Sequence, residues 1–241
     1  MVQKRIVRTV IGKLMPSPVQ VRHAEYSMLF SADDDVSQPS KYLISLALDA
    51  VRNAQEISLD DISAKMKNPP YYPNIYPGEH YKLLGGLILA LKPKVVVEIG
   101  TSTGLSALSM KKFLPPESKI VTFDIKDWKS FRNSCLQEDD FRDGRLVQYI
   151  DDLSNPPITS KYRQLLQEAN MIFVDAFLHN GVMEQRLLEN FKTISFNAKP
   201  LMIFDDIRLW NMLKFWRNIS LPKLDLTSFG HWSGTGIIEW K

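Results

Sequence analysis

The sequence predicts an α/β protein built on a doubly wound, mostly parallel sheet of seven strands. From residue 95 onwards, apolar strand-like runs alternate with helix-like runs, and acids stand at the ends of most strand-like runs. The last two strand-like runs are joined by a turn too short for a parallel crossover, which predicts a C-terminal antiparallel hairpin. We therefore expect a helical N-terminal extension, residues 1–70, followed by an α/β domain, residues 71–241.

Composition excludes several classes of protein. The chain has 241 residues, 44% of them hydrophobic, which is enough for a substantial core. Its net charge of +3 comes from basic residues clustered before Glu25, and the remainder is too balanced to predict a nucleic-acid partner. No apolar run reaches the roughly 18 residues of a transmembrane segment. The lone Cys135 allows no disulfide framework and favours a reducing, cytoplasmic location.

The expected extension begins with an amphipathic segment. Apolar residues recur at helical spacing over residues 1–15, with basic residues between them. This pattern favours an arm of a homodimer or a helix packed on the main domain, and a helix lying on a membrane surface is the alternative. Residues 16–39 read as a loop. Helices are expected over residues 41–55 and 58–67, and a proline-rich connector then leads to a helix over 79–91.

The α/β domain is expected to contain a regular series of elements. Strands are predicted at residues 95–99, 119–124, 146–150, 171–175, 201–205, 225–229 and 235–240. Helices are predicted at residues 105–113, 128–136, 161–168, 182–194 and 207–219.

The segment Val95–Ser106 carries the most informative motif. Three β-branched residues lead through Glu98 into a turn bracketed by Gly100 and Gly104, and a helix-like run follows. Ser102 stands where a dinucleotide site has its middle glycine, and no Gly-Lys-Ser/Thr follows, which argues against NAD, FAD and a nucleotide-triphosphate loop. An acid before such a turn favours a ligand with an ammonium group and a ribose. A strand-to-helix turn without a ligand is the alternative.

Acidic residues end successive predicted strands. In a doubly wound sheet, the carboxyl ends of the strands face one crevice, so these acids are expected to share a site. A single acid in such a place is often only the N-cap of the next helix, but five strand ends in register favour a common function. The acids are Glu98, Asp124, Asp151 or Asp152, Asp175, and Asp205 or Asp206.

With these motifs the chain resembles the class I methyltransferases that use S-adenosylmethionine (SAM). It is most similar to the metal-dependent small-molecule O-methyltransferases, such as the catechol and macrocin O-methyltransferases and the cephalosporin hydroxylase-like group. The likeness covers about residues 71–241. It rests on Val-Glu-Ile-Gly-Thr-Ser-Thr-Gly-Leu-Ser, Val-Thr-Phe-Asp124, Ile-Phe-Val-Asp175, Ile-Phe-Asp205-Asp206 and the tail Gly-His-Trp-Ser-Gly-Thr-Gly.

The resemblance implies a cofactor site for SAM. The turn after the first strand would surround the methionine end, with Glu98 near the ammonium group and backbone N–H groups near the carboxylate. Asp124 would accept hydrogen bonds from the ribose hydroxyls, and Asp152, with Asp151 as its rival, would lie beside the adenine amino group. The connector carrying Tyr76 would cover SAM, or would be only a brace across the sheet edge. The implied cofactor-binding residues are Tyr76, Glu98, Gly100, Thr101, Ser102, Gly104, Ser106, Asp124, Asp151, Asp152 and Asp175.

The resemblance also implies a divalent cation at Asp175, Asp205 and Asp206. Oxygen ligands without His or Cys suit a hard ion, so Mg²⁺ is expected first, with Mn²⁺ or Ca²⁺ also compatible. The alternative is that Asp206 caps the following helix while Asp205 forms a salt bridge. The lysine base of the catechol enzyme is absent, because Leu178 stands at its place. His179 is therefore the candidate base, beside Asp175 in the catalytic site.

The expected function is metal-assisted transfer of a methyl group from SAM to a hydroxyl of a small molecule. Within the same fold, a metal-independent methyltransferase is the runner-up. A non-catalytic SAM-binding or scaffold protein is the rival from another class.

Overall fold

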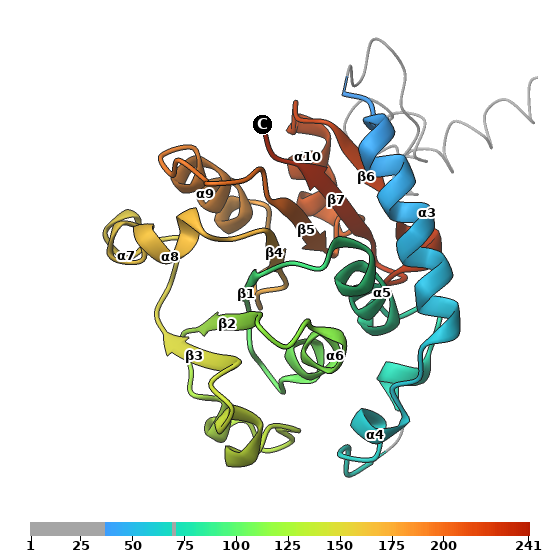
Figure 1. Cartoon of the computed structure of the whole chain (residues 1–241). Coiled ribbons are helices and arrows are strands. Elements are labelled where there is room, and N and C mark those ends of the chain that lie inside the picture. Colours follow the sequence, from blue (N-terminus) through green and yellow to red (C-terminus); the bar gives the residue numbers. More distant parts are fainter. Residues whose placement is uncertain (1–36, 69–70) are drawn as a thin grey trace, which may run out of the picture.

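A computed structural model describes residues 37–68 and 71–241, and the expected N-terminal amphipathic helix lies outside these ranges. The centre is a seven-stranded sheet with the strand order β3-β2-β1-β4-β5-β7-β6 (Figure 1). The first five strands run parallel, and β7 is antiparallel to both β5 and β6. The predicted fold class is confirmed. Over the described residues, no helix has the length and apolar character needed to cross a membrane.

The strand order reverses between β1 and β4. The chain runs outward from β1 through β2 to β3, and then returns to place β4 on the other side of β1. Such a switch point opens a crevice at the carboxyl ends of the strands, which is where open α/β sheets bind ligands. The strands are β1 Val95–Ile99, β2 Lys119–Asp124, β3 Leu146–Ile150, β4 Met171–Val174, β5 Leu201–Asp205, β6 Lys223–Asp225 and β7 Thr235–Glu239.

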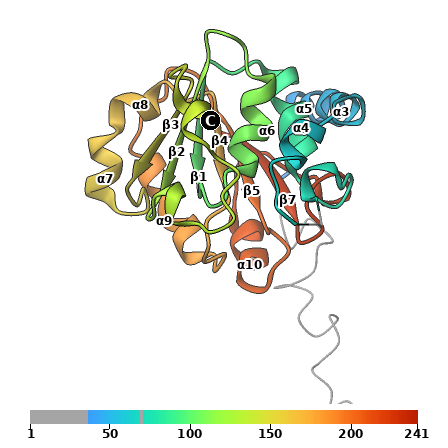
Figure 2. The ribbon, with the colours of Figure 1, turned by 90° about the horizontal axis from the view of Figure 1, so that it is seen from below.

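The sheet is the middle of three layers (Figure 2). Alternate residues of each central strand point to opposite faces, so Val96 packs with α3, α5 and α6 while Val97 packs with α8, α9 and α10. Both faces are therefore buried, as the continuous apolar runs of the central strands predict. The helices are α3 Lys41–Glu56, α4 Asp60–Ser63, α5 Tyr81–Leu91, α6 Leu105–Phe113, α7 Pro156–Lys161, α8 Arg163–Gln167, α9 Val182–Phe191 and α10 Trp210–Asn218.

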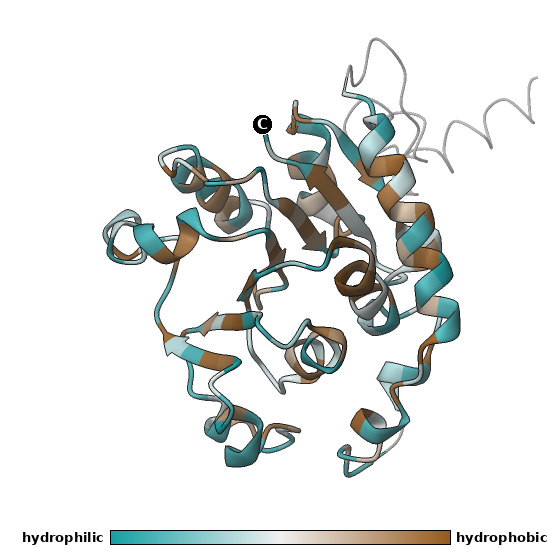
Figure 3. Cartoon of the chain, viewed as in Figure 1, coloured by the Kyte–Doolittle hydropathy of each residue, from teal (hydrophilic) through white to brown (hydrophobic). Residues whose placement is uncertain are grey.

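Helix α3 packs closely along α5. A Cβ atom added at Gly86 would lie 2.2 Å from the backbone oxygen of Ala50, so the two helices approach to a distance that only glycine permits there. Helix α5 is hydrophobic around most of its surface, whereas α3 has a hydrophobic stripe toward it (Figure 3). The side chain of Ser40 caps α3 by accepting from the Leu43 N–H at 3.1 Å.

Three expected elements differ clearly from the structure, and one helix was not expected. Residues 128–136 contain only the 3-10 turn Trp128–Ser130, and the helix expected at 58–67 is limited to α4. The strand expected at 225–229 ends at Asp225, because Asp225 turns the chain by accepting from the Thr227 N–H at 2.8 Å. Helix α7 was missed, although prolines in its first turn are compatible with a helix start.

Candidate active site

The turn after β1 lies directly on the end of β4. The Asp175 N–H donates to the Ile99 carbonyl at 2.9 Å, and Gly100 has a φ of +106°. A Cβ atom at Gly100 would lie 1.9 Å from the backbone oxygen of Asp175. At Gly104, with a φ of +82°, a Cβ would instead meet the side chain of Leu136 at 2.2 Å. Both glycines are thus required by close packing as well as by positive φ.

Asp124 lies at the mouth of this turn. Its carboxylate accepts the Ser102 N–H and the Lys126 N–H, each at 3.0 Å. The bond to Ser102, which has a φ of +43°, ties the end of β2 to the turn after β1. Below it, the hydroxyls of Thr101 and Thr122 are 2.7 Å apart and buried. The two neighbouring strand ends therefore form one connected polar surface.

Glu98 lies inside the protein beneath the turn. It is fully buried, and the Ser106 hydroxyl donates to its Oε1 at 2.6 Å. Its Oε2 has no hydrogen-bond partner among the described residues. Burial, only partly opposed by the hydrogen bonds from Ser106 and Thr122, raises the pKa of Glu98 to about 7. An unpaired buried carboxylate oxygen suits a cationic partner better than a neutral one.

The two acids after β3 have different surroundings. Asp151 forms a 2.7 Å ion pair with Lys161 and accepts from the Tyr162 hydroxyl at 2.6 Å. Hydrogen bonds from Lys161 and Tyr162 lower its pKa. Asp152 is exposed, and its Oδ1 accepts the Ser154 N–H at 2.8 Å in a local turn. Asp151 therefore interacts with two other side chains, whereas Asp152 forms its hydrogen bond only with the backbone.

The three acids expected to bind a cation are brought together at the ends of β4 and β5. His179 connects two of them, with its Nε2 3.5 Å from Asp175 Oδ1 and its Nδ1 3.2 Å from Asp206 Oδ2. Asp205 and Asp206 are buried, and Asp206 has a φ of +59°. The candidate base therefore lies among the metal-site acids, with each ring nitrogen facing a carboxylate.

Asp206 does not cap the helix that follows it. Helix α10 begins at Trp210, and its N-cap is Leu209, which makes no side-chain cap. The carboxylate of Asp206 instead accepts a short hydrogen bond from the Ser233 hydroxyl in the C-terminal hairpin turn. The capping alternative for Asp206 is therefore wrong, and its side chain belongs to the acidic cluster.

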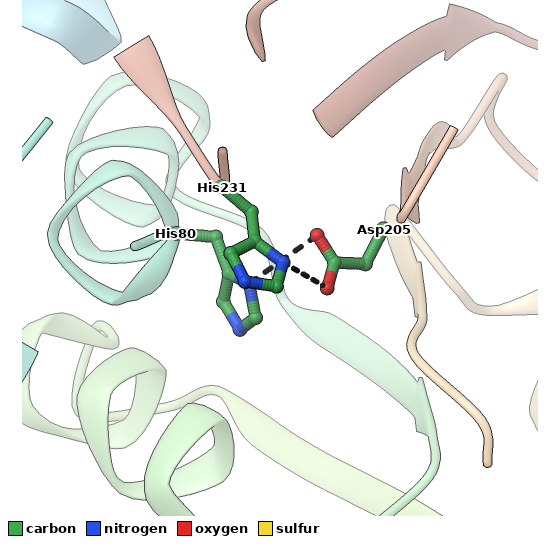
Figure 4. A group of neighbouring side chains, drawn as sticks. All are labelled: His80, Asp205 and His231. Carbon is green, nitrogen blue, oxygen red and sulfur yellow. Dashed lines mark hydrogen bonds and ion pairs between the residues drawn. The ribbon is translucent and has the colours of Figure 1, made fainter. Parts of the chain in front are cut away.

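Sequence reasoning missed two histidines of this cluster. His80 Nδ1 lies 3.3 Å from Asp205 Oδ1 and its Nε2 lies 3.8 Å from Asp175 Oδ2. His231 Nδ1 lies 2.9 Å from Asp205 Oδ2, and its Nε2 lies 3.7 Å from Glu79 Oε2. Figure 4 shows both imidazole rings turned toward the carboxylate of Asp205.

Backbone pairing between distant segments brings these histidines together. The Gly78 N–H donates to the Gly230 carbonyl at 3.0 Å, and the Trp232 N–H donates to the Gly78 carbonyl at 3.0 Å. The connector before α5 is thus joined to the turn between β6 and β7. Tyr76, in the same connector, packs against the core on the α5 side, and its hydroxyl is buried without a partner among the described residues.

The cluster is electrostatically coupled. Burial, reinforced by the charge of Asp205, raises the pKa of Asp175 to about 6. Burial alone would also raise the pKa of Asp205, but His80 and His231 hold it well below its usual range. Burial lowers the pKa of His231, and hydrogen bonds to Asp205 and Asp206 more than reverse this, raising it to about 10. Four carboxylates, with Glu79 as the fourth, thus share one site with three imidazoles.

Comparison with known proteins identifies the family. The family model described as O-methyltransferase matches residues 49–211, which is more than half of the chain. The chain belongs to this family, and its resemblance to the class I SAM-dependent methyltransferases is confirmed. No curated protein matches the chain.

Solved structures show the same fold. A methyltransferase from Geobacter sulfurreducens is 18% identical, with a TM-score of 0.55 over 77% of this chain and 92% of the other. The SAH-bound methyltransferase PaMTH1 from Podospora anserina is 18% identical, with a TM-score of 0.52 over 86% of this chain and 91% of the other. At this identity the likeness supports the fold alone.

Proposed function

We propose that the chain transfers the methyl group of SAM to a hydroxyl of a small molecule, assisted by a divalent cation at Asp175, Asp205 and Asp206. The observation that carries the metal assignment is the position of His179, whose single ring contacts carboxylates from the ends of two adjacent strands. His80 likewise faces both Asp175 and Asp205, so the three acids gather at the carboxyl edge of the sheet, beside the turn after β1.

The proposed SAM site lies on the other side of this turn. Asp124 would receive the ribose hydroxyls through carboxylate lone pairs not used by the Ser102 and Lys126 N–H groups. The unpaired Oε2 of Glu98 would neighbour the ammonium group. Asp152 is preferred over Asp151 beside adenine, because Lys161 and Tyr162 already engage Asp151. The helix N-terminus at α6 adds positive potential near the methionine carboxylate.

The acidic residues present fit a divalent cation. Neighbouring carboxylates repel one another, and burial together with the charge of Asp205 raises the pKa of Asp175 to about 6. A bound cation would supply Lewis-acid chemistry, lowering the pKa of the acceptor hydroxyl. The chain's own contribution is to orient cofactor and acceptor on two sides of the Gly100 turn, which is mainly catalysis by proximity.

His179 is the proposed general base. Its ring lies at the site, where an imidazole nitrogen can accept a proton from an acceptor hydroxyl. Because both ring nitrogens face carboxylates, one nitrogen must turn to the acceptor hydroxyl for the proton to move.

A homodimer formed through the N-terminal extension and a cytoplasmic location are further parts of the proposal. The amphipathic pattern of residues 1–15 supports the first, and the lone cysteine supports the second.

Turnover of labelled SAM with a panel of hydroxylated acceptors tests this function. We expect methyl transfer with Mg²⁺ and its loss with EDTA and in Asp206→Asn, whereas Asp151→Asn serves as a matched control that retains activity. Transfer that survives EDTA and both Asp205→Asn and Asp206→Asn would point to a metal-independent methyltransferase. SAM binding without turnover of any acceptor, with any divalent ion, would favour a non-catalytic SAM-binding protein.

A further inference from the structure

Two histidines not expected at the acidic cluster change the chemistry that this cluster offers to a cation. His80, Asp205 and His231 each present one ligand atom, and these three atoms all lie within 4.8 Å of one another. Such a set of two imidazoles and one carboxylate differs from the all-oxygen set expected from the sequence. We propose that His80, Asp205 and His231 bind a first-row transition-metal ion, in the series from Mn²⁺ to Zn²⁺, in preference to Mg²⁺.

His80 provides the strongest observation. Its side chain is 4% exposed, and among the described residues neither ring nitrogen makes a well-formed hydrogen bond. A buried polar group without such a bond costs about 1–3 kcal/mol, so an unsatisfied imidazole calls for an explanation. Its Nδ1 faces Asp205 Oδ1 at 3.3 Å, inside the cluster (Figure 4). A metal ion between them would use the lone pair that the fold leaves without a hydrogen bond.

The rings are held in place before any ion binds. His80 packs against Tyr81 and Phe173, with ring centroids 4.5 and 5.3 Å away. His231 stands edge-on to His80, with centroids 5.4 Å apart, and its backbone N–H donates to the Thr235 hydroxyl at 2.9 Å. Rigid support of this kind is what fixes the orientation of metal-binding imidazoles.

The ligand atoms, two imidazole nitrogens and one carboxylate oxygen, determine which ion is preferred. Imidazole nitrogen suits Zn²⁺, Fe²⁺ and Ni²⁺, whereas Mg²⁺ prefers oxygen ligands and retains its waters. Affinities of mixed nitrogen and oxygen sites also rise along the first row towards Cu²⁺. The alternative is that His80 and His231 are protonated counter-ions of Asp205 and bind no metal. In that alternative burial lowers the pKa of His80, and the charges of Asp205 and Asp175 more than reverse this. Metal titration distinguishes the two, because protonated counter-ions would bind no transition ion.

This site shares Asp205 with the cation site of the proposed function, and the inference rests on that function only through this residue. Its test is metal binding itself, measured without SAM or acceptor. Chelator-treated protein would be titrated with Zn²⁺, Mn²⁺ and Mg²⁺ against a chromophoric chelator. Pulsed EPR of the Mn²⁺-loaded protein would detect ¹⁴N modulation from bound imidazole. The variants are His231→Ala, His80→Ala and, as a matched control that removes a neighbouring imidazole, His179→Ala.

We expect Zn²⁺ to bind more tightly than Mg²⁺, with ¹⁴N modulation in the Mn²⁺ spectrum. His231→Ala and His80→Ala should each weaken Zn²⁺ binding by at least about 10–100-fold, and His179→Ala should leave the modulation in place. If His80→Ala fails to fold, the half-buried His231 decides the test. Unchanged affinity and modulation in His231→Ala, or no binding of any transition ion, would overturn the inference. Failure of SAM binding with intact Zn²⁺ binding would instead contradict only the proposed function.

Discussion

His231 Nδ1 lies 2.9 Å from Asp205 Oδ2, and this contact fixes the C-terminal hairpin turn to the end of β5. Because the same turn pairs with Gly78, the contact also positions the connector that carries Glu79 and His80. The C-terminal residues thus complete a site whose other members come from the ends of β4 and β5.

The His231–Asp205 pair should make stability depend on pH in chelator-treated protein. The folded-state pKa of His231 is raised to about 10, so the stability it contributes is fully present below its unfolded pKa near 6.5 and is lost as pH rises through 10. Relative to His231→Gln, the wild type should be more stable near pH 6, and the difference should shrink as pH rises towards 10. Urea unfolding of both proteins at pH 6, 8 and 10 measures this difference. A gap that does not narrow with rising pH would contradict the assignment.

Replacing Glu98 with glutamine should stabilise the protein at alkaline pH. The raised pKa means that Glu98 is protonated in the folded state below pH 7, and that wild-type stability falls as pH rises through 7. Glu98→Gln should therefore gain up to about 3 kcal/mol over the wild type at pH 8.5 and little at pH 4.5. Denaturant unfolding at both pH values checks this. Equal gaps at the two pH values would rule out a buried titrating carboxyl.

Glu98→Gln has a second expected effect, on the cofactor. If the unpaired Oε2 faces the ammonium group of SAM, loss of the charge should weaken SAM binding by about tenfold, which is the size of one hydrogen bond to a charged group. A titration at pH 8.5, above the pKa of Glu98, measures the affinity with the carboxylate ionised. Ser106→Ala removes the neighbouring hydroxyl but keeps the carboxylate, and should cost less SAM affinity.

Gly100→Ala should destabilise the protein far more than Gly144→Ala. Both positions have positive φ, so both substitutions carry a backbone cost of about 1–2 kcal/mol. At Gly100 the new Cβ would also lie 1.9 Å from the Asp175 backbone oxygen, whereas at Gly144 nothing lies within 4 Å. We expect a total loss above about 4 kcal/mol at Gly100. Thermal unfolding compares the two, and similar melting temperatures would show that the turn is not packed on β4 as described.

Asp124→Asn should weaken SAM binding by about 10–100-fold with little loss of stability, because hydrogen bonds to a charged group contribute about 1.5–3 kcal/mol. Asp151→Asn is the matched control. Its carboxylate pairs with Lys161 and Tyr162, so its loss should leave SAM affinity within about twofold of the wild type, below 1 kcal/mol. The reverse order of effects would exchange the roles given to these acids.

Strand-end acids were predictable from sequence, whereas the histidines were not. Asp124, Asp175 and Asp205 follow apolar runs, and parallel topology brings such ends to one edge. His80 and His231 follow no strand, and their position depends on backbone pairing at Gly78 that no periodicity encodes. The sequence offered only a weak indication that these histidines belong to a site, because each is a single histidine beside a turn that contains glycine or proline. The all-oxygen cation site came from the family resemblance, whose implied cation ligands include neither His80 nor His231.

Loops between elements were also poorly predicted. Residues 128–136 have helix-like spacing, yet the chain there turns at Asp127, whose carboxylate accepts the Lys129 N–H at 2.8 Å. Local capping by an Asp side chain competes with helix formation, and a hydrophobic pattern does not record that competition. The central strands were predicted closely because burial on both faces leaves a long apolar signal.

Calorimetric titration of the purified wild type and Asp124→Asn with SAM, in Mg²⁺ and again in EDTA, tests the central claim most directly. The account predicts wild-type binding in the micromolar range in both conditions, weakened by about tenfold or more in Asp124→Asn. No binding heat under either condition, from wild-type protein shown to be folded by circular dichroism, would contradict it. The turn from Gly100 to Gly104 would then be only a strand-to-helix connection.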